Sequence, residues 1–228
     1  MDLLGRAITD FFDGKEYRLW VHDHHGPRTE MPIPYYFRTE LDMPEMEVLA
    51  MDLCQGKTLD IGAGAGSHAL YLQDKGVHVT ALDISPALVA VMEERGVEQA
   101  VAGDIFTYEE GPYDTLLLLM NGIGLVGTTG GLRQFLAQAG QLLAPGGQLL
   151  FDSSDVAYLY EDGIPAMDHY YGEIECRYEY RKQKTDWFHW LYIDQQLLKD
   201  IAAEEGWRVE ILMEDDSNQY LARLQRNV

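Results

Sequence analysis

Three glycines at alternate positions follow a short apolar segment that contains a single acid. The sequence LDIGAGAGSH occupies residues 59–68, with the acid at Asp60. Glycines in this pattern allow a tight turn and let a bulky ligand approach the backbone closely. A second acid, Asp83, ends the next apolar segment, where a carboxylate can accept hydrogen bonds from both hydroxyls of a ribose. These residues predict a site for an adenosine-containing ligand.

Two kinds of adenosine ligand fit a glycine loop of this form. Residues 64–69, GAGSHA, match the G-x-G-x-x-A fingerprint of dinucleotide sites, so an NAD(P)-dependent oxidoreductase is one alternative. Asp60 disfavours it, because a negative charge two residues before the first glycine suits a ligand with an ammonium group and is awkward near a pyrophosphate. Asp104 follows a third strand, at a position suited to an adenine amino group. An antiparallel hairpin that ends the chain is also uncommon in hydride-transfer domains.

Alternating strands and helices are expected to place these residues at one edge of a sheet. The pattern predicts strands over residues 58–61, 77–82, 99–102, 113–120 and 148–151, and helices over 67–75, 85–94 and 132–143. The 113–120 segment is almost continuously apolar, as expected for a strand that is buried on both faces of a parallel sheet. This order predicts an α/β fold with a doubly wound sheet.

The two ends of the chain add further elements. Before the core we expect a helix over 3–12, an irregular stretch over 22–34 and a second helix over 44–54. After it we expect a hairpin with strands 173–181 and 187–193 and a turn at 182–186, then a helix from Asp194 to Gly206 and a strand pair, 207–213 and 219–224. We therefore predict a single domain, residues 1–228. It comprises an N-terminal helical cap or lid (1–56), a cofactor-binding core (57–153), an inserted hairpin that could cover the substrate (154–193), and a C-terminal helix and strand pair (194–228).

Five motifs in this order resemble the class I S-adenosylmethionine-dependent methyltransferases. They are LDIGAGAG at 59–66, ALDIS at 81–85, GDI at 103–105, YDTL at 113–116 and LAPGG at 143–147. The resemblance covers residues 57–153 and 194–226. It implies a Rossmann-like seven-stranded sheet with one antiparallel strand near its edge, S-adenosyl-L-methionine as the cofactor, and methyl transfer as the reaction.

The resemblance also implies a cofactor site. In it, the glycine loop and Asp60 hold the methionine part, Asp83 binds the ribose, Asp104 and Ile105 bind the adenine, and Met120 lies with Asn121 near the methyl group. In many such enzymes the segment before the glycine strand folds over the cofactor, although residues 35–38 could equally pack under the N-terminal helix. The expected set is Tyr36, Arg38, Asp60, Gly62, Ala63, Gly64, Gly66, Asp83, Ile84, Gly103, Asp104, Ile105, Met120 and Asn121.

The methyl acceptor is expected to be a small molecule with an O, N or C nucleophile. The chain has 17 Lys and Arg against 38 Asp and Glu, a formal charge of −21, which repels a phosphate backbone. Residues 121–124, NGIG, are not the loop of amino-methylating nucleic-acid enzymes, and neither cysteine follows a proline. Nucleic acid is therefore disfavoured. The aromatic inserted hairpin could serve either as an acceptor wall or as the interface of a homodimer.

No catalytic base is assigned from the sequence. His169, Tyr170 and His189 are candidates only because they lie in the variable region. We interpret His22, His24 and His25 as part of a solvated loop, so no metal site is predicted.

Three expectations concern the chain as a whole. Cys54 and Cys176 are too far apart in sequence, without nearby His partners, to indicate a disulfide scaffold or a zinc finger. The N-terminus lacks a signal-peptide pattern and no segment is apolar enough to span a membrane, so a cytoplasmic protein is expected. A non-catalytic adenosyl-ligand-binding protein on the same fold remains an alternative.

Overall fold

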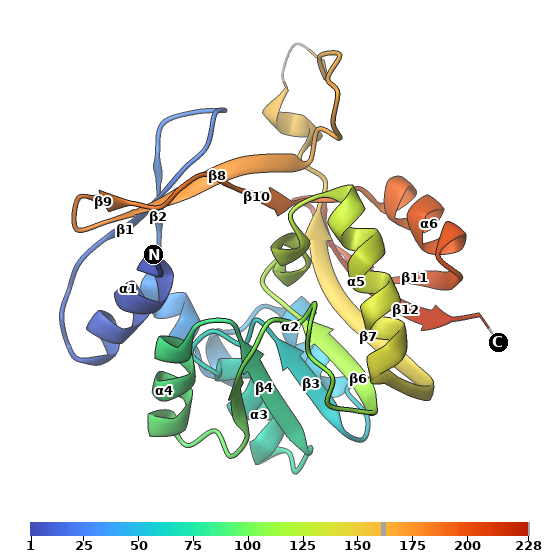
Figure 1. Cartoon of the computed structure of the whole chain (residues 1–228), viewed down its shortest axis with the longest axis horizontal. Helices are drawn as coiled ribbons and strands as arrows, with labels where there is room; N and C mark the ends of the chain where they lie inside the picture. Colours follow the sequence, from blue (N-terminus) through green and yellow to red (C-terminus); the bar gives the residue numbers. More distant parts are fainter. Residues whose placement is uncertain (161–162, 228) are drawn as a thin grey trace.

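A seven-stranded sheet forms the centre of the computed structural model, which describes residues 1–160 and 163–227 (Figure 1). The strand order is β11-β12-β7-β6-β3-β4-β5. The strands are β3 (Thr58–Ile61), β4 (Val79–Asp83), β5 (Ala100–Ala102), β6 (Tyr113–Leu118), β7 (Leu143–Ser154), β11 (Trp207–Glu214) and β12 (Gln219–Arg226). The five strands from β5 to β7 are parallel, whereas β12 is antiparallel to both of its neighbours. The predicted doubly wound sheet with an antiparallel C-terminal strand is confirmed.

Helices cover both faces of this sheet because its central strands are apolar on both sides. Helices α2 (Glu45–Asp52), α3 (Ser67–Asp74) and α4 (Pro86–Arg95) pack on one face, against residues such as Leu117 and Leu150. Helices α5 (Thr129–Leu142) and α6 (Gln195–Glu204) pack on the other, against their sequence neighbours Leu116 and Leu149. Adjacent residues of one strand thus belong to different cores, which explains the nearly continuous apolar run.

Caps set where the helices beside the site begin. Ser85 precedes α4 and its Oγ accepts from the backbone N–H of Leu88, while Pro86 occupies the first helical turn. Asp194 caps α6 by accepting from the N–H groups of Gln196 and Leu197. Both capping residues lie where the predicted helices begin.

A second sheet lies beyond the carboxyl ends of the parallel strands, with β10 in contact with the turn that follows β6 (Figure 1). Its order is β10-β8-β1-β2, with β9 also paired to β8. The strands are β1 (Leu19–His22), β2 (Thr29–Met31), β8 (Glu173–Tyr180), β9 (Gln183–Lys184) and β10 (Phe188–Leu191). The predicted inserted hairpin is confirmed as β8 with β9 and β10.

Two sequence predictions about this sheet are wrong. The stretch 22–34, predicted to be irregular, contains β2 and the end of β1, and β1 pairs with β8 so that Leu19 lies opposite Tyr180. The hairpin turn is not 182–186 but a tight turn at Arg181 and Lys182, which both have positive φ. β1 and β2 have only four and three residues, and they form because β1 pairs with β8, a strand far along the chain.

The N-terminal segment reaches the glycine loop through a third apolar core. Helix α1 (Leu3–Phe12) contributes Ile8, β1 contributes Leu19 and β8 contributes Tyr180, and all three pack with Ala65 of the glycine loop and Leu88 of α4. Short 3-10 turns, η1 (Ile33–Phe37) and η2 (Glu40–Asp42), connect this core to α2, while η3 (Gly122–Val126) and η4 (Ala157–Leu159) follow β6 and β7.

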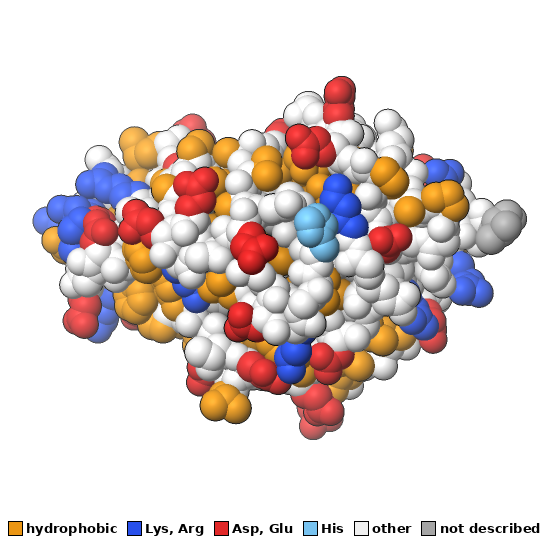
Figure 2. Space-filling view, turned by 90° about the horizontal axis from the view of Figure 1, so that it is seen from below, with side chains coloured by type: hydrophobic (Ala, Val, Ile, Leu, Met, Phe, Trp, Pro, Cys, Tyr) orange, Lys and Arg blue, Asp and Glu red, His pale blue; other side chains and the backbone are white. Residues whose placement is uncertain are grey.

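Charge is unevenly distributed over this fold. Figure 2 shows Lys and Arg side chains gathered at the end of the molecule that carries β1 and β9 in Figure 1, with acids scattered over the rest of the face in view. Arg18, Arg28, Arg181 and Lys182 line a shallow hollow at that end. Within the described residues, none of the helices is long and apolar enough to cross a membrane.

Candidate functional site

The glycine loop joins β3 to α3 and lies next to the end of β4. Gly62, Gly64 and Gly66 all have positive φ, between +59° and +82°, which side chains rarely adopt. The N–H of Gly62 donates to the carbonyl of Leu82, at 2.8 Å, and the N–H of Gly64 donates to Asp83 Oδ2, at 2.9 Å. The loop is therefore bound directly to the second acid predicted from sequence.

Asp83 is buried and uses both carboxylate oxygens. Its Oδ1 accepts from the N–H of Ser85, at 2.9 Å, opposite the bond from Gly64. Burial raises the pKa of Asp83, and the two backbone N–H donors oppose this change. The N–H of Gly103 donates to the Asp83 carbonyl, at 2.9 Å, so the end of β5 is adjacent as well. The Asp83 side chain thus holds the glycine loop next to the residue that begins α4.

Asp60 lies beneath the loop and is 1% exposed. Its Oδ2 has no hydrogen-bond partner among the described residues. Burial raises the pKa of Asp60 to about 6, with the charge of Asp83 adding to the increase and the charge of His68 opposing it. A buried oxygen of this kind is energetically costly unless something pairs with it. The arrangement therefore suits a cation that enters beside the loop.

Tyr36, in η1, lies against the loop. A Cβ atom on Gly64 would be 3.1 Å from Tyr36 Cδ1, and Ser67 Oγ donates to the Tyr36 carbonyl at 2.7 Å. Burial raises the pKa of Tyr36 to about 12, with the charge of Asp83 adding to the effect, so its phenol remains neutral.

The Arg38 side chain points to α2 and not to the glycine loop. Its Nη2 donates to both carboxylate oxygens of Glu47 in α2, at 2.7 and 2.8 Å, and Glu47 in turn accepts from His68 Nε2, at 2.9 Å. Arg38 therefore connects to the loop through Glu47 and His68, not by a direct contact. His68 itself is buried.

The residues after β4 and β5 differ in exposure. Ile84 is 72% exposed beside Asp83, whereas Ile105 is buried in the main core. Asp104 is exposed and accepts from the N–H of Phe106, at 3.0 Å. The carboxyl ends of β4 and β5 thus bring Ile84, Gly103 and Asp104 to one side of Asp83.

Met120 and Asn121 follow β6 and both have positive φ, 63° and 53°. The N–H of Asn121 donates to both oxygens of Asp152, at 2.9 Å each, and Ser154 Oγ donates to Asn121 Oδ1, at 3.0 Å. Asp152 also accepts from Gln219 Nε2. Burial raises the pKa of Asp152 to about 6, and the hydrogen bonds from Asn121 and Gln219 oppose this change. Side chains from two strands, β7 and β12, therefore fix this turn after β6.

Aromatic side chains of the second sheet face the site. The Trp190 ring lies against Gly124 of η3, where an added Cβ would come within 1.9 Å of its Nε1. Tyr178 and Phe188 pack with ring centroids 5.1 Å apart. Burial raises the pKa of Tyr178, and the nearby phenols of Tyr36 and Tyr192 add to that increase. Tyr36 of η1 and Tyr192, which follows β10, lie beside them. We call Tyr36, Tyr178, Phe188, Trp190 and Tyr192 together the aromatic roof.

The side chains considered as bases or metal ligands have other surroundings. His169 and His189 are exposed, and Tyr170 donates to Asp194 Oδ2, at 2.7 Å. His22 pairs with Glu179 across the second sheet, and His24 pairs with Glu175. No group of three or more acid, His or Cys side chains in the described parts of the chain is arranged to hold a metal ion.

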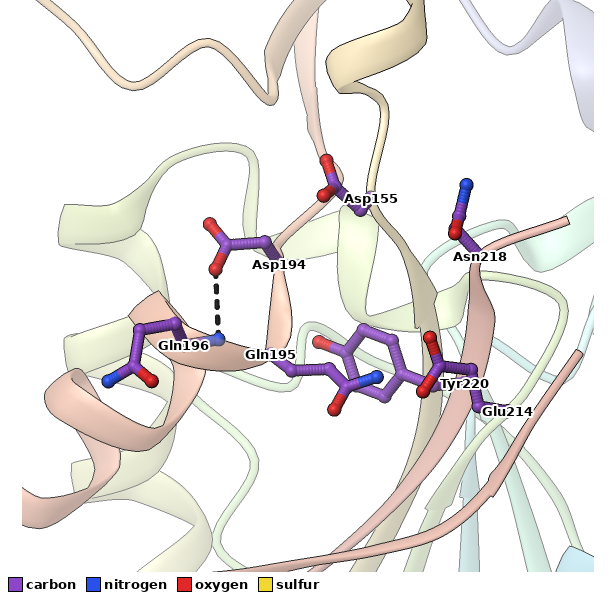
Figure 3. A pocket seen from close by; sticks show the side chains of 7 residues that line it. All are labelled: Asp155, Asp194, Gln195, Gln196, Glu214, Asn218 and Tyr220. Atoms are coloured by element: carbon purple, nitrogen blue, oxygen red, sulfur yellow. Dashed lines mark hydrogen bonds between the residues drawn. The ribbon is translucent and has the colours of Figure 1, made fainter.

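A hollow of about 220 Å³ opens beside the carboxyl end of β7 (Figure 3). Its acids already have structural partners: Asp194 caps α6, and Asp155 accepts from the N–H of Ala157 and from the Tyr171 hydroxyl. None of the cofactor residues predicted from sequence lines it. The residues that do are Asp155, Asp194, Gln195, Gln196, Glu214, Asn218 and Tyr220.

Sequence reasoning missed Glu47 and Asp152 at this site. Asp152 lies near the carboxyl end of β7 as Asp83 does at the end of β4, so the same signal, an acid late in a buried strand, could have found it. Glu47 is one acid among several around α2, and nothing in its local pattern distinguishes it.

Comparison with known proteins places this site in a family. Residues 58–147 match the model of a methyltransferase domain family. A SAM-dependent methyltransferase from Bacteroides fragilis, crystallised with S-adenosyl-L-homocysteine, is 42% identical, and the alignment covers 100% of this chain and 95% of that one, with a TM-score of 0.92. No curated protein matches the sequence.

More distant structures share the fold. The CcbJ methyltransferase from Streptomyces caelestis is 16% identical over 82% of this chain and 91% of its own, with a TM-score of 0.65. CalS10, an amino pentose methyltransferase from Micromonospora echinaspora, is 19% identical over 79% of this chain and 87% of its own, with a TM-score of 0.55.

The fold and the glycine site define a Rossmann-like enzyme that binds an adenosyl cofactor, and the resemblance inferred from sequence is confirmed. The chain belongs to the S-adenosylmethionine-dependent methyltransferases. S-Adenosyl-L-methionine is its cofactor, and the NAD(P)-dependent oxidoreductase alternative is set aside, as is the non-catalytic one.

Proposed function

We propose that this enzyme methylates an O, N or C nucleophile of a small molecule held between the glycine loop and the aromatic roof. The observation that supports this most directly is the position of Trp190 on Gly124. The turn that contains Gly124 follows β6, beside the glycine loop, and ligands of doubly wound sheets bind beyond the carboxyl ends of such strands. Flat aromatic faces there suit a small acceptor.

The residues around the loop fit the cofactor. The unpaired Oδ2 of Asp60 would accept from the ammonium of the methionine part, and the positive-φ glycines leave room for the chain of the ligand beside the backbone. Each oxygen of Asp83 accepts one backbone bond and has a further lone pair for a ribose hydroxyl. Tyr36 would close over the ligand from η1. When bound, the cofactor supplies an electrophilic methyl group on a sulfonium.

The remaining work of the protein would be to orient the acceptor and to keep water away. Correct orientation of two reactants alone is worth several kcal/mol of the barrier. The Asp152–Asn121 contact fixes the turn beside the glycine loop, and the aromatic roof covers it. The candidate bases from sequence are exposed or engaged, so we assign no proton transfer to them.

A polynucleotide acceptor is disfavoured by the net charge of −21. The basic end of the molecule, where Arg181 and Lys182 lie, is formed by the β8–β9 turn and not by the glycine loop. The aromatic roof could instead contact a second copy of the chain, and this homodimer is the alternative that the Trp190 experiment in the Discussion tests.

Thermal melts with S-adenosyl-L-homocysteine, NAD and NADP test the cofactor side of the proposal. A ligand present at about a hundred times its Kd should stabilise the fold by about 2.7 kcal/mol. We expect S-adenosyl-L-homocysteine to raise the Tm and the two dinucleotides to leave it unchanged. For the acceptor, release of S-adenosyl-L-homocysteine is measured against small amines, phenols and carbon acids, with an oligonucleotide as the comparison. Turnover of the oligonucleotide alone would overturn the proposal.

A further inference from the structure

Four side chains of alternating charge form a row that ends beneath the glycine loop. Arg38 donates to both oxygens of Glu47, and His68 Nε2 donates to Glu47 Oε2, at 2.9 Å. His68, in the first turn of α3, is near enough to Asp60 for each to affect the titration of the other. Glu47, His68 and Asp60 are each less than 10% exposed. The row therefore alternates basic and acidic side chains from the N-terminal segment to the site.

One carboxylate oxygen of the last member of this row lacks a hydrogen-bond partner. Asp60 Oδ2 is buried and has no hydrogen bond, whereas nearly every other buried side-chain oxygen in the part of the chain that the structure describes has one. An ammonium group beside this oxygen would continue the alternation of charge. The methionine part of the cofactor has such a group, and its binding to Asp60 is the proposed function on which this inference rests.

Glu47 favours the charged form of His68. Burial opposes the imidazolium, but the hydrogen bond to Glu47 and the charges of Asp60 and Glu47 outweigh it and raise the pKa of His68. Burial likewise opposes the Glu47 carboxylate, but the bonds and charges of His68 and Arg38 lower its pKa. Each group thus supports the ionisation of its neighbour.

His68 is the cation that counteracts the burial of Asp60. The other titratable groups that face these residues are acids or a thiol. Asp83 raises the pKa of Asp60, Cys54 faces Asp60 as a thiol whose own pKa is raised by burial, and Asp152 faces Glu47. Without a charged His68, the backbone N–H of Ala69 would be left to oppose the burial and the charge of Asp83 that favour protonation of Asp60.

We propose that Glu47 and His68 are positioning residues for the ammonium group of the cofactor. Glu47 keeps His68 cationic, and His68 keeps Asp60 ionised so that its free oxygen can receive the ammonium. Arg38 stabilises the carboxylate of Glu47. A residue of the N-terminal segment thus acts on cofactor binding without touching the cofactor.

Calorimetry with two ligands tests this proposal in the full-length protein. S-Adenosyl-L-homocysteine has the amino group, whereas 5′-methylthioadenosine keeps the adenosine and sulfur but lacks the amino-acid part. Glu47→Gln removes the charge and retains an amide oxygen for His68. We expect it to weaken S-adenosyl-L-homocysteine at least about ten-fold and 5′-methylthioadenosine less than about two-fold, because a charge-assisted bond is lost only for the first ligand. Glu45→Gln, an exposed position in the same helix, is the matched control and should change neither.

The pH profile separates positioning from a general structural role. In the wild type, affinity for S-adenosyl-L-homocysteine should fall below about pH 6, where Asp60 becomes protonated, while that for 5′-methylthioadenosine stays level. In Glu47→Gln the fall should begin at higher pH. His68→Gln keeps a hydrogen-bond donor but has no charge, and its affinity for S-adenosyl-L-homocysteine should also begin to fall at higher pH. This variant is measured in place of Glu47→Gln if Glu47→Gln does not fold.

Three results would overturn the inference: equal weakening of both ligands, an unshifted pH profile in the variants, or a level wild-type profile for S-adenosyl-L-homocysteine. Failure of the wild type to bind either ligand would instead refute the proposed cofactor site itself.

Discussion

The backbone N–H of Asn121 donates to both carboxylate oxygens of Asp152, at 2.9 Å each. Asn121 and the preceding Met120 both have positive φ, a conformation that costs non-glycine residues energy and needs support from its surroundings. A buried carboxylate at the end of β7 thus stabilises an unfavourable turn at the end of β6. This turn lies at the edge of the sheet where the glycine loop binds its ligand.

Asp152→Ala should therefore loosen this turn locally. Loss of the acceptor leaves the Asn121 N–H without its partner, and we expect its amide hydrogen exchange to accelerate at least about ten-fold, the equivalent of about 1.4 kcal/mol. Asp155→Ala is the control, because Asp155 contacts Ala157 and Tyr171 and not Asn121. If the Asn121 amide exchanges no faster in Asp152→Ala, the turn is stable without the contact to Asp152.

Gly124→Ala should destabilise the fold. The new methyl group would lie within 2.3 Å of three atoms of the Trp190 ring, which is too rigid to move aside cheaply. Overpacking of this kind costs about 1–3 kcal/mol, measurable by urea unfolding. Because Trp190→Ala removes the clash, the double variant should recover part of the loss, and strictly additive effects would contradict the contact.

Asp60→Asn should stabilise the free protein and impair cofactor binding. The pKa of Asp60 is raised from 3.8 to about 6, so the folded state binds its proton more tightly than the unfolded state does. The resulting penalty is full above about pH 6 and disappears below 3.8, and two pKa units correspond to about 3 kcal/mol at most.

Thermal melts of wild type and Asp60→Asn between about pH 4 and pH 8 check this sign. The variant should melt at higher temperature near neutral pH, and the difference should shrink as the pH falls. Calorimetry should show weaker binding of S-adenosyl-L-homocysteine. If the variant is less stable than the wild type at neutral pH, the ionised Asp60 carboxylate must already have a stabilising partner in the ligand-free protein.

Asp83→Asn should weaken S-adenosyl-L-homocysteine at least about ten-fold, since hydrogen bonds to a charged acceptor are worth about 1.5–3 kcal/mol each. Asp83→Ala should in addition lower stability, because it leaves the N–H groups of Gly64 and Ser85 without their acceptor. Comparison of affinity by calorimetry with unfolding free energy separates the two effects. Unchanged affinity in a destabilised protein would leave Asp83 with a structural role alone.

Trp190→Ala distinguishes an acceptor wall from a dimer interface. If the aromatic roof contacts the acceptor, turnover of an acceptor found by screening should fall, while S-adenosyl-L-homocysteine affinity and the mass from light scattering stay unchanged. A change from dimer to monomer with turnover retained would establish the interface. Trp20→Ala, on the other face of the second sheet and stacked with Arg28, is the matched control.

Local patterns in the sequence determined the central sheet, the glycine loop and the acids at its strand ends. Apolar runs, glycines and caps act over a few residues, so the strand before Gly62, the helix from Ser67 and the cap at Ser85 could each be predicted from their own neighbourhood. The parallel strands then had to bring Asp60, Asp83 and Asp104 to one edge.

Only the tertiary structure decided which side chains meet above that edge. The short strands β1 and β2 form because β8, more than a hundred residues away, pairs with β1. Arg38 turns from the loop to Glu47, and His68 is buried between Glu47 and Asp60, because α2 packs beside α3. Hydrogen bonds between distant segments leave no periodic trace in a sequence, so these partners became visible only in the folded chain.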